Sequence, residues 1–334
     1  MLVRDFTTKH SFQAVIDSFD HIKRLGVNAI QLMPVQEFEN NESWGYNPEF
    51  YMALDKYYGP ANKLKELIDL AHQNGISVIL DVTFNHISGT SPLCQMYWNS
   101  TASKPAVGNP WVNPDSRHLY SPTPDLNHES VWTKEYCKAA FKYWMDEFRV
   151  DGFRLDLSKG FTQNDRCGGS QFDATCFSGY DASRIAILKD YNSFVQAQAP
   201  GMYMILEHLC EAQEEQELGA NGMMLWTKFH TEFKQAAMGF ASNLDISSAK
   251  SGSFRSWDSY DRPVIYAVSH DEERLMVECI NNGNQVSGYS TRATATALRR
   301  MELLAAFQFT TPGAKMLWMF DELGYDYSIE KLWR

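Results

Sequence analysis

Two kinds of hydrophobic spacing alternate along this chain. Short runs of consecutive apolar residues predict buried strands, and between them apolar residues recur every three to four positions, which predicts amphipathic helices. Stripes of helical spacing cover residues 12–22 and 64–71, and Gly26 and Gly75 follow them, where glycine commonly ends a helix. The alternation of the two spacings predicts a chain built from successive strand–helix units.

Eight apolar runs of strand type divide the sequence. They span residues 1–6, 27–33, 76–82, 150–157, 202–207, 223–226, 264–269 and 315–320. Eight strands that alternate with helices predict an α/β protein, a (β/α)8 TIM barrel, rather than an open doubly wound sheet. Residues 87–129, after the third strand, are rich in Pro, Asn, Ser and Gly and lack periodicity, which predicts a short irregular insertion. Residues 1–334 would form one barrel domain, and flanking domains could lie outside this chain.

Acidic residues follow several of the predicted strands. Asp81, Asp156, Glu207 and Asp271 each stand near the carboxyl end of one run. In a barrel of this type that end carries the active site, so the sequence predicts a ring of acids there. A single acid after a strand is often only a helix N-cap, but the same placement on several strands favours a chemical role.

Two carboxylates that face each other can cleave a glycosidic bond. In the retaining mechanism they lie about 5–5.5 Å apart, one attacks the sugar, and the other protonates the leaving oxygen. Arg154 stands two positions before Asp156, so both side chains point to the same face of the strand. A neighbouring guanidinium keeps a carboxylate ionised, as a nucleophile must be. Glu207 follows an apolar run, which suits an acid that must hold its proton.

Composition narrows the range of partners. The net charge of -11 argues against nucleic acid or an anionic membrane surface and is compatible with a neutral substrate. Aromatic residues make up 13% of the chain, enough to supply stacking faces for sugars, although most of them should fill the core. No run of 18 apolar residues is present, so no membrane span is predicted.

Cysteine placement bears on the cellular compartment. Cys167 and Cys176 share a loop that could close as a small disulfide ring, and the sequence leaves the bond itself open. Such a bond would favour a periplasmic or extracellular protein over a cytoplasmic one. The four remaining cysteines are scattered and are predicted to be buried thiols.

Six short motifs, taken in order, carry a family resemblance. They are Trp-Gly-Tyr-Asn-Pro at 44–48, Asp-Val-Thr-Phe-Asn-His at 81–86, Pro-Asp-Leu-Asn at 124–127, Gly-Phe-Arg-Leu-Asp at 152–156, Glu207 after its apolar run, and Ser-His-Asp at 269–271. Together they resemble the short sequence regions of the α-amylase superfamily, glycoside hydrolase family 13. Leu-Met-Pro at 32–34 and Leu-Ser-Lys-Gly-Phe at 157–161 are most similar to its bacterial α-amylase-like branch.

The resemblance assigns roles to the acids. It implies that Asp156 is the nucleophile, Glu207 the general acid/base, and Asp271 the acid that binds sugar hydroxyls and stabilises the transition state. Arg154 would orient Asp156, and Asp81 would brace the site.

The resemblance also implies four further contacts to the substrate. His86 and His270 would hydrogen-bond the sugar beside the cleaved bond, and Tyr46 would stack on that same sugar. Lys159 matches a position that often contacts the leaving side of the substrate, with a solvated lysine as the alternative.

A calcium ion is a question that the resemblance raises. Many family members carry a histidine after the lysine, and its carbonyl holds calcium together with the asparagine that corresponds to Asn85. Here Gly160 follows Lys159, and Asp115 and Asp125 would be available as further oxygen donors. Calcium therefore stays open as a cofactor, and the family chemistry requires no redox cofactor.

The sequence thus predicts a retaining glycosidase with a neutral α-glucan substrate. The expected activity is endo-acting cleavage of α-1,4-glucosidic bonds in starch, glycogen or maltooligosaccharides. A glucan-branching or debranching enzyme would share the same three acids and stays open. A non-catalytic glucan-binding protein or transporter subunit is the alternative of another class, and the presence of all three acids argues against it.

Overall fold

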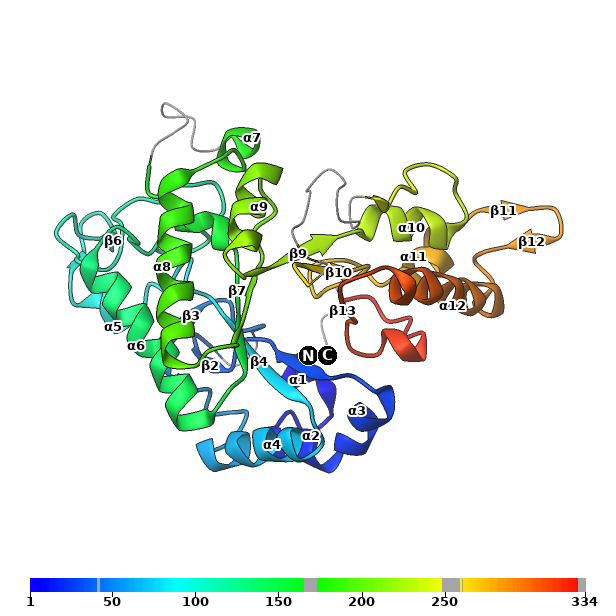
Figure 1. Cartoon of the computed structure of the whole chain (residues 1–334), viewed down its shortest axis with the longest axis horizontal. Coiled ribbons are helices and arrows are strands. Elements are labelled where there is room, and N and C mark those ends of the chain that lie inside the picture. The colour runs from blue at the N-terminus through cyan, green and yellow to red at the C-terminus, as the bar shows by residue number, and fades with distance from the viewer. Residues whose placement is uncertain (41–42, 165–172, 248–258, 260, 330–334) are drawn as a thin grey trace. The chain divides into compact units, whose positions relative to one another are not determined.

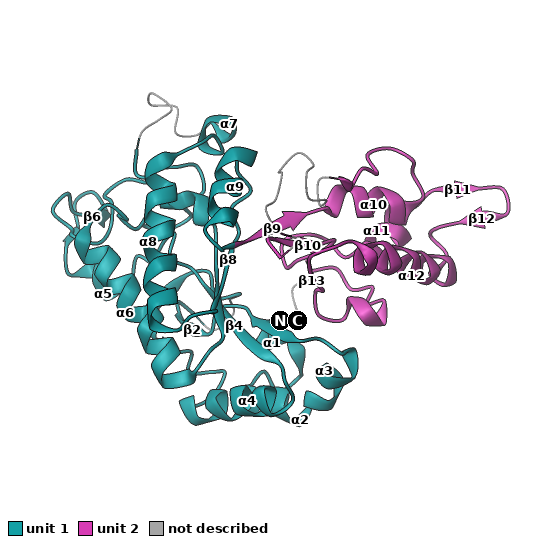
Figure 2. Ribbon diagram, viewed as in Figure 1, with its two compact units in different colours: residues 1–223 teal, residues 224–334 magenta. Residues whose placement is uncertain are grey.

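The computed structural model describes residues 1–40, 43–164, 173–247, 259 and 261–329. The chain divides into two compact units, residues 1–223 and 224–334 (Figure 2). Each unit contains parallel strands and the helices that follow them (Figure 1). The two units are described separately below.

Unit 1 is built around four parallel strands. In spatial order they are β1 (Ala29–Leu32), β4 (Ser77–Val82), β7 (Gly152–Leu155) and β8 (Tyr203–Leu206). Every residue of β7 is buried, as expected for a parallel strand covered on both faces. The predicted strands at these four places are confirmed, with shorter bounds.

The helices of unit 1 alternate with these strands. They are α2 (Phe12–Asp17), α3 (Phe19–Leu25), α4 (Ala61–Gln73), α6 (Val131–Phe148), α8 (Ala182–Gln198) and α9 (Ala212–Ala220), with the short helices α1 (Val3–Phe6), α5 (Pro92–Gln95) and α7 (Ala174–Phe177). The stripe predicted at 12–22 is divided at Ser18, which ends α2 and precedes α3. Gly26 ends α3 in the left-handed conformation with φ 69°, which glycine adopts without steric cost.

The strand predicted at residues 1–6 is wrong, because Val3–Phe6 form helix α1. Of this predicted strand, Met1 forms backbone hydrogen bonds beside β1. Its amino group lies 2.6 Å from the Gln31 carbonyl oxygen, and its own carbonyl oxygen accepts from the Met33 N–H at 2.9 Å. The apolar run is only three residues long before Arg4, and so short a run does not distinguish strand from helix.

Two excursions follow the first two strands of the sheet. After β1 comes an antiparallel pair, β2 (Gln36–Phe38) and β3 (Pro48–Leu54). The predicted insertion at 87–129 contains α5 and a second small pair, β5 (Trp98–Asn99) and β6 (Lys104–Pro105). A bridge between His86 and Asp125 joins the two ends of that insertion. Both excursions leave from the carboxyl ends of strands, the edge where the acids were predicted.

Unit 2 repeats the same alternation. Its parallel strands are β9 (Met224–Lys228), β10 (Pro263–Tyr266) and β13 (Ala314–Met316), with β10 in the centre. Its helices are α10 (His230–Met238), α11 (Leu275–Asn282) and α12 (Thr294–Thr310), joined by the hairpin β11 (Gln285–Val286) and β12 (Tyr289–Ser290). The last predicted strand, 315–320, is confirmed only in its first part, and Asp321–Leu323 form a 3₁₀ turn.

Two further expectations concern cysteines and membranes. Cys176 is disulfide-bonded, while Cys94, Cys137, Cys210 and Cys279 are free thiols. The partner predicted for Cys176, residue 167, lies outside the described residues. Across the described ranges, no helix is both long and apolar enough to cross a membrane.

Candidate active site

Three predicted site carboxylates of unit 1 meet around one arginine. The Nη1 atom of Arg154 lies 2.7 and 2.8 Å from the two carboxylate oxygens of Asp81 and 2.9 Å from Oδ1 of Asp156. Its Nη2 atom donates to Oε2 of Glu207 at 2.8 Å. The cluster forms because β4, β7 and β8 are neighbours in parallel register, so that their carboxyl ends meet at one edge.

The electrostatics of this cluster follow from its burial. The side chains of Arg154 and Asp81 are both fully buried. Burial by itself would lower the pKa of Arg154, but the charges of Asp81, Glu207 and Asp156 raise that pKa well above its usual value. Burial raises the pKa of Asp81, against the opposing effect of the guanidinium. Arg154 therefore stays charged among these carboxylates.

Tyr46 bonds both the cluster, through Asp81, and His86. The Tyr46 hydroxyl donates to Oδ2 of Asp81 at 2.9 Å, and burial raises its pKa well above the usual value. Burial lowers the pKa of His86 to about 4, so this imidazole is neutral at neutral pH. Its Nε2 lies 2.7 Å from the Tyr46 carbonyl oxygen and its Nδ1 lies 2.8 Å from Nδ2 of Asn85. Both ring nitrogens thus bond protein groups here, and direct contacts of His86 and Tyr46 with a sugar stay predictions.

Lys159 lies against aromatic side chains. Its ammonium nitrogen is 5.4 Å from the ring centre of Tyr120 and 5.5 Å from that of Phe177, within cation–π range. Phe177 in turn stacks on His118, with ring centres 5.0 Å apart. Neither ring was singled out from the sequence, and the contact of Lys159 with the leaving side of the substrate stays a prediction.

The remaining predicted residues, His270 and Asp271, belong to unit 2 and follow β10. The backbone N–H and hydroxyl of Ser269 donate to Oε2 of Glu272 at 2.9 and 2.6 Å. Lys228 at the end of β9 pairs with the other oxygen of that carboxylate at 2.6 Å. The Ser269 hydroxyl also accepts from the Asp271 N–H at 3.2 Å, so this network fixes the turn that carries Asp271, whose side chain is 49% exposed.

Of the oxygen donors considered for calcium, one has no protein partner among the described residues and two bond protein groups. Within that described part of the chain, Oδ1 of Asn85 is buried without a hydrogen-bond partner. Asp125 accepts from Asn113 at 2.7 Å and from His118 at 3.2 Å. Asp115 is exposed and paired with Lys104. Calcium therefore stays open as a cofactor, since backbone carbonyls and water also serve as its ligands.

The glycine after Lys159 has a steric reason. A Cβ atom at Gly160 would overlap the side-chain oxygen of Asn85 and come within 2.8 Å of the His118 ring. Any larger residue in this 3₁₀ turn, Ser158–Phe161, would therefore force these two side chains to shift. Gly160, the point where the sequence departs from the family pattern, thus allows the close packing of the Asn85 and His118 side chains.

Sequence reasoning missed a buried polar group that adjoins Glu207. Its members come from the 3₁₀ turn, α8, the segment after β8, and α9, and they are Ser158, Arg184, His208 and Glu214. No sequence signal joins these residues, because each looks like an ordinary polar position in its own segment and only the fold brings them together.

Comparisons with known proteins agree with the geometry. The family model described as "Alpha amylase, catalytic domain" matches residues 9–116 and 97–331. A cyclomaltodextrinase from Bacillus sp. is 28% identical over 337 residues, which cover 94% of this chain and 52% of that protein. The chain therefore spans about half the length of this relative.

Solved structures share the fold. A pullulanase from Anoxybacillus sp. complexed with maltotetraose gives a TM-score of 0.74 at 20% identity, covering 98% of this chain and 52% of the other. An α-amylase from Geobacillus thermoleovorans complexed with acarbose gives 0.69 at 20% identity, covering 95% and 66%. These likenesses confirm the predicted α/β barrel fold.

Proposed function

Because the chain belongs to the alpha-amylase catalytic-domain family, glycoside hydrolase family 13, we propose that it cleaves α-1,4-glucosidic bonds with retention of configuration. The observation that carries the proposal is the pair of carboxylates, Asp156 and Glu207, bonded to adjacent nitrogens of Arg154. Two acids that share one guanidinium are close together, which favours the short separation of retaining enzymes, about 5–5.5 Å.

The chemistry follows from these positions. Asp156, kept ionised by Arg154, attacks the anomeric carbon while Glu207 gives its proton to the leaving glycosidic oxygen. The bond to the leaving sugar breaks, and a covalent glycosyl ester on Asp156 remains. Glu207, now a carboxylate, takes a proton from water as that water attacks the ester and releases the sugar. Asp271 is proposed to bind hydroxyls of the reacting sugar and to stabilise the positive charge that develops.

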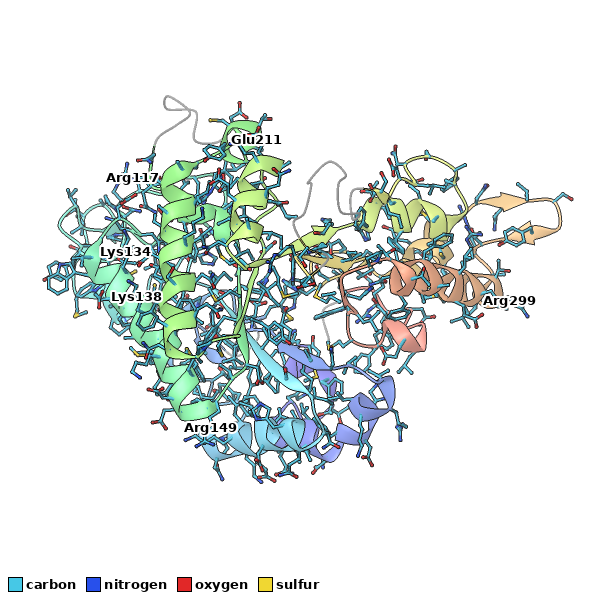
Figure 3. The ribbon with its side chains drawn as sticks, in the orientation of Figure 1. Arg117, Lys134, Lys138, Arg149, Glu211 and Arg299 are labelled. Carbon is cyan, nitrogen blue, oxygen red and sulfur yellow. The ribbon has the colours of Figure 1, made fainter. Side chains whose placement is uncertain are left out.

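A neutral glucan suits the charges. Arg154, the cation at the centre of the cluster, is already committed to three carboxylates. Lys134, Lys138 and Arg149, labelled in Figure 3, lie on or directly after the outer helix α6 and not among the strand ends. A phosphorylated substrate would need a basic cluster or a free helix start at the site. The related cyclomaltodextrinase and the maltotetraose-bound pullulanase support an α-glucan.

A substrate panel tests this proposal. At equal concentration we expect turnover of soluble starch and maltoheptaose, and little on cellulose, sucrose or a maltose phosphate. Pullulan is included because a debranching enzyme would cleave its α-1,6 bonds and leave amylose intact. The Asp156→Asn variant serves as the blank. Strong turnover of a β-linked glucan with none on starch would refute the proposal, and binding of starch without any turnover would favour the non-catalytic alternative.

A further inference from the structure

A closed ring of buried hydrogen bonds lies behind the proposed acid/base. The Ser158 hydroxyl is 2.9 Å from Nδ1 of His208, and Nε2 of His208 is 2.7 Å from Oε1 of Glu214. Arg184 binds both carboxylate oxygens of Glu214, at 2.6 and 2.7 Å. Its Nη1 donates to the carbonyl oxygen of Lys159 at 3.0 Å, which returns the ring to the residue after Ser158. All four side chains are buried.

Burial and neighbouring charges shift the pKa values of the two titratable members that lie side by side, Glu214 and His208. Burial would raise the pKa of Glu214, but His208 and Arg184 lower it to about 2, so the carboxylate is ionised. Burial lowers the pKa of His208. A neutral imidazole can donate only once, and its Nε2–H bonds Glu214. The single Ser158 hydroxyl proton then serves either Nδ1 of His208 at 2.9 Å or the Glu207 carbonyl oxygen at 3.0 Å. Each of the four side chains thus has at least one hydrogen-bond partner, as a buried polar network requires.

The ring is attached directly to Glu207. The Ser158 N–H donates to the Glu207 carbonyl oxygen at 2.9 Å, and the N–H of the preceding Leu157 donates to Oε2 of the Glu207 carboxylate at 2.9 Å. The 157–158 segment therefore holds both ends of Glu207. The same carboxylate oxygen, Oε2, also accepts a hydrogen bond from Nη2 of Arg154.

Two left-handed residues mark the segments that the ring joins. Leu157 has φ 43° and Leu209 has φ 51°, a conformation that residues other than glycine rarely adopt. Leu157 lies directly before Ser158, and Leu209 lies directly after His208. Such conformations persist only where the surroundings hold them, and the ring ties the neighbours of both residues. The turn at Leu157 is also the one that aims a backbone N–H at the Glu207 carboxylate.

A metal site is the other reading of this cluster. His208, Cys210 and Glu214 offer ligand atoms within 4.8 Å of one another. Arg184 already occupies both oxygens of Glu214 and lies 3.4 Å from Sγ of Cys210. A cation at that point would face a buried guanidinium on two of its three ligands, so the arrangement favours a hydrogen-bonded scaffold.

We propose that His208 is a positioning residue for Glu207: through Ser158 it holds the Leu157 turn that orients the carboxylate toward the leaving oxygen. The inference rests on the proposed function, because it assigns Glu207 the proton transfer. The four side chains of the ring are buried and do not contact the substrate. All four belong to unit 1.

The test uses two substrates that differ in their need for a proton. Cleavage of maltoheptaose requires protonation of the leaving oxygen, whereas the fluoride of α-maltosyl fluoride departs without it. The ratio kcat/KM, which reports the bond-breaking step, is measured on both substrates for His208→Ala, His208→Gln and Ser158→Ala. We expect a loss of at least about tenfold on maltoheptaose and under about threefold on the fluoride, because general acid catalysis contributes about 10²–10⁴-fold and acts only on the first substrate. His208→Gln, which keeps a donor toward Glu214, should lose less than His208→Ala.

His128→Gln is the matched control. His128 is another fully buried histidine of unit 1 that bridges two protein groups, Tyr191 at 2.8 Å and the Phe84 carbonyl at 2.7 Å. It should change both rate constants by the same factor. Equal losses on the two substrates in the His208 and Ser158 variants would overturn the proposal. If His208→Ala does not fold, Ser158→Ala decides the question, since it breaks the ring of hydrogen bonds without removing a buried imidazole.

Glu207→Gln in the same assay separates this inference from the proposed function. It should lose far more on maltoheptaose than on the fluoride. If it does and the ring variants do not, the ring proposal fails and the function stands. If Glu207→Gln itself loses equally on both substrates, the role assigned to Glu207 is wrong.

Discussion

Asp156→Asn is expected to lower kcat on maltoheptaose by at least about 10³-fold, equivalent to about 4 kcal/mol of transition-state stabilisation. The amide keeps the shape of the side chain but cannot form the glycosyl ester. Of the other two carboxylates at Arg154, Asp81 is fully buried and Glu207 is needed as the acid, so neither can replace it as the nucleophile. Steady-state rates together with thermal unfolding by circular dichroism would measure the effect.

Asp151→Asn is the control for that variant. Asp151 immediately precedes β7, at the amino end of the same strand, where it accepts from the Val78 N–H at 2.6 Å and pairs with His72 at 2.8 Å. Its loss should lower stability and leave kcat within about twofold, because residues at the amino end of a barrel strand serve stability and not catalysis. Activity of Asp156→Asn within about tenfold of the wild type, only about 1.4 kcal/mol, would contradict the assignment.

Arg154→Met is expected to have the second large effect, on stability as well as on rate. It leaves Asp81, Asp156 and Glu207 without their shared guanidinium, and removal of one partner of a buried ion pair costs about 3–5 kcal/mol. Urea unfolding monitored by tryptophan fluorescence would report the loss. The double variant Arg154→Met/Asp81→Asn should recover part of it, because the fully buried member of the trio is then neutral.

The pH dependence of that loss has a definite sign. The pKa of Asp81 is already raised by burial in the wild type, and removal of Arg154 removes the effect that opposes burial. The folded variant therefore binds a proton more tightly than the unfolded chain, and its stability falls as pH rises through the folded-state pKa. The difference from the wild type should be smaller in acid than at neutral pH. An unfolding free energy within about 1 kcal/mol of the wild type at neutral pH would show that Arg154 is not the charge centre of the site.

The strands were predictable because burial on both faces leaves a strong mark in the sequence. Runs such as Val78–Leu80 are apolar throughout and are followed by an acid, and seven of the eight predicted strands occur among the described residues. Residues 1–6 failed because three apolar residues before a charged pair carry no period. The same argument placed Asp81, Arg154, Asp156 and Glu207 at one edge, since parallel neighbours in register must bring their ends together.

The surroundings of the acids were not predictable in the same way. Arg184 and His208 meet in space through the 3₁₀ turn and α9, although they lie on separate segments with no shared period. Nor did the sequence show that both nitrogens of His86 are held by protein groups. Such contacts depend on side-chain directions and on backbone turns like that of Leu157, for which a leucine gives no local signal.

The anomeric form of the first product tests the central claim most directly. If Asp156 forms a glycosyl ester, two inversions return the original configuration, so proton NMR of a fresh maltoheptaose digest should show the α-anomer before the β-anomer accumulates by mutarotation. The Asp156→Asn variant run in parallel should release neither. Immediate release of the β-anomer by the wild type would mean that water attacks directly, and it would contradict both the retaining mechanism and the role of Asp156.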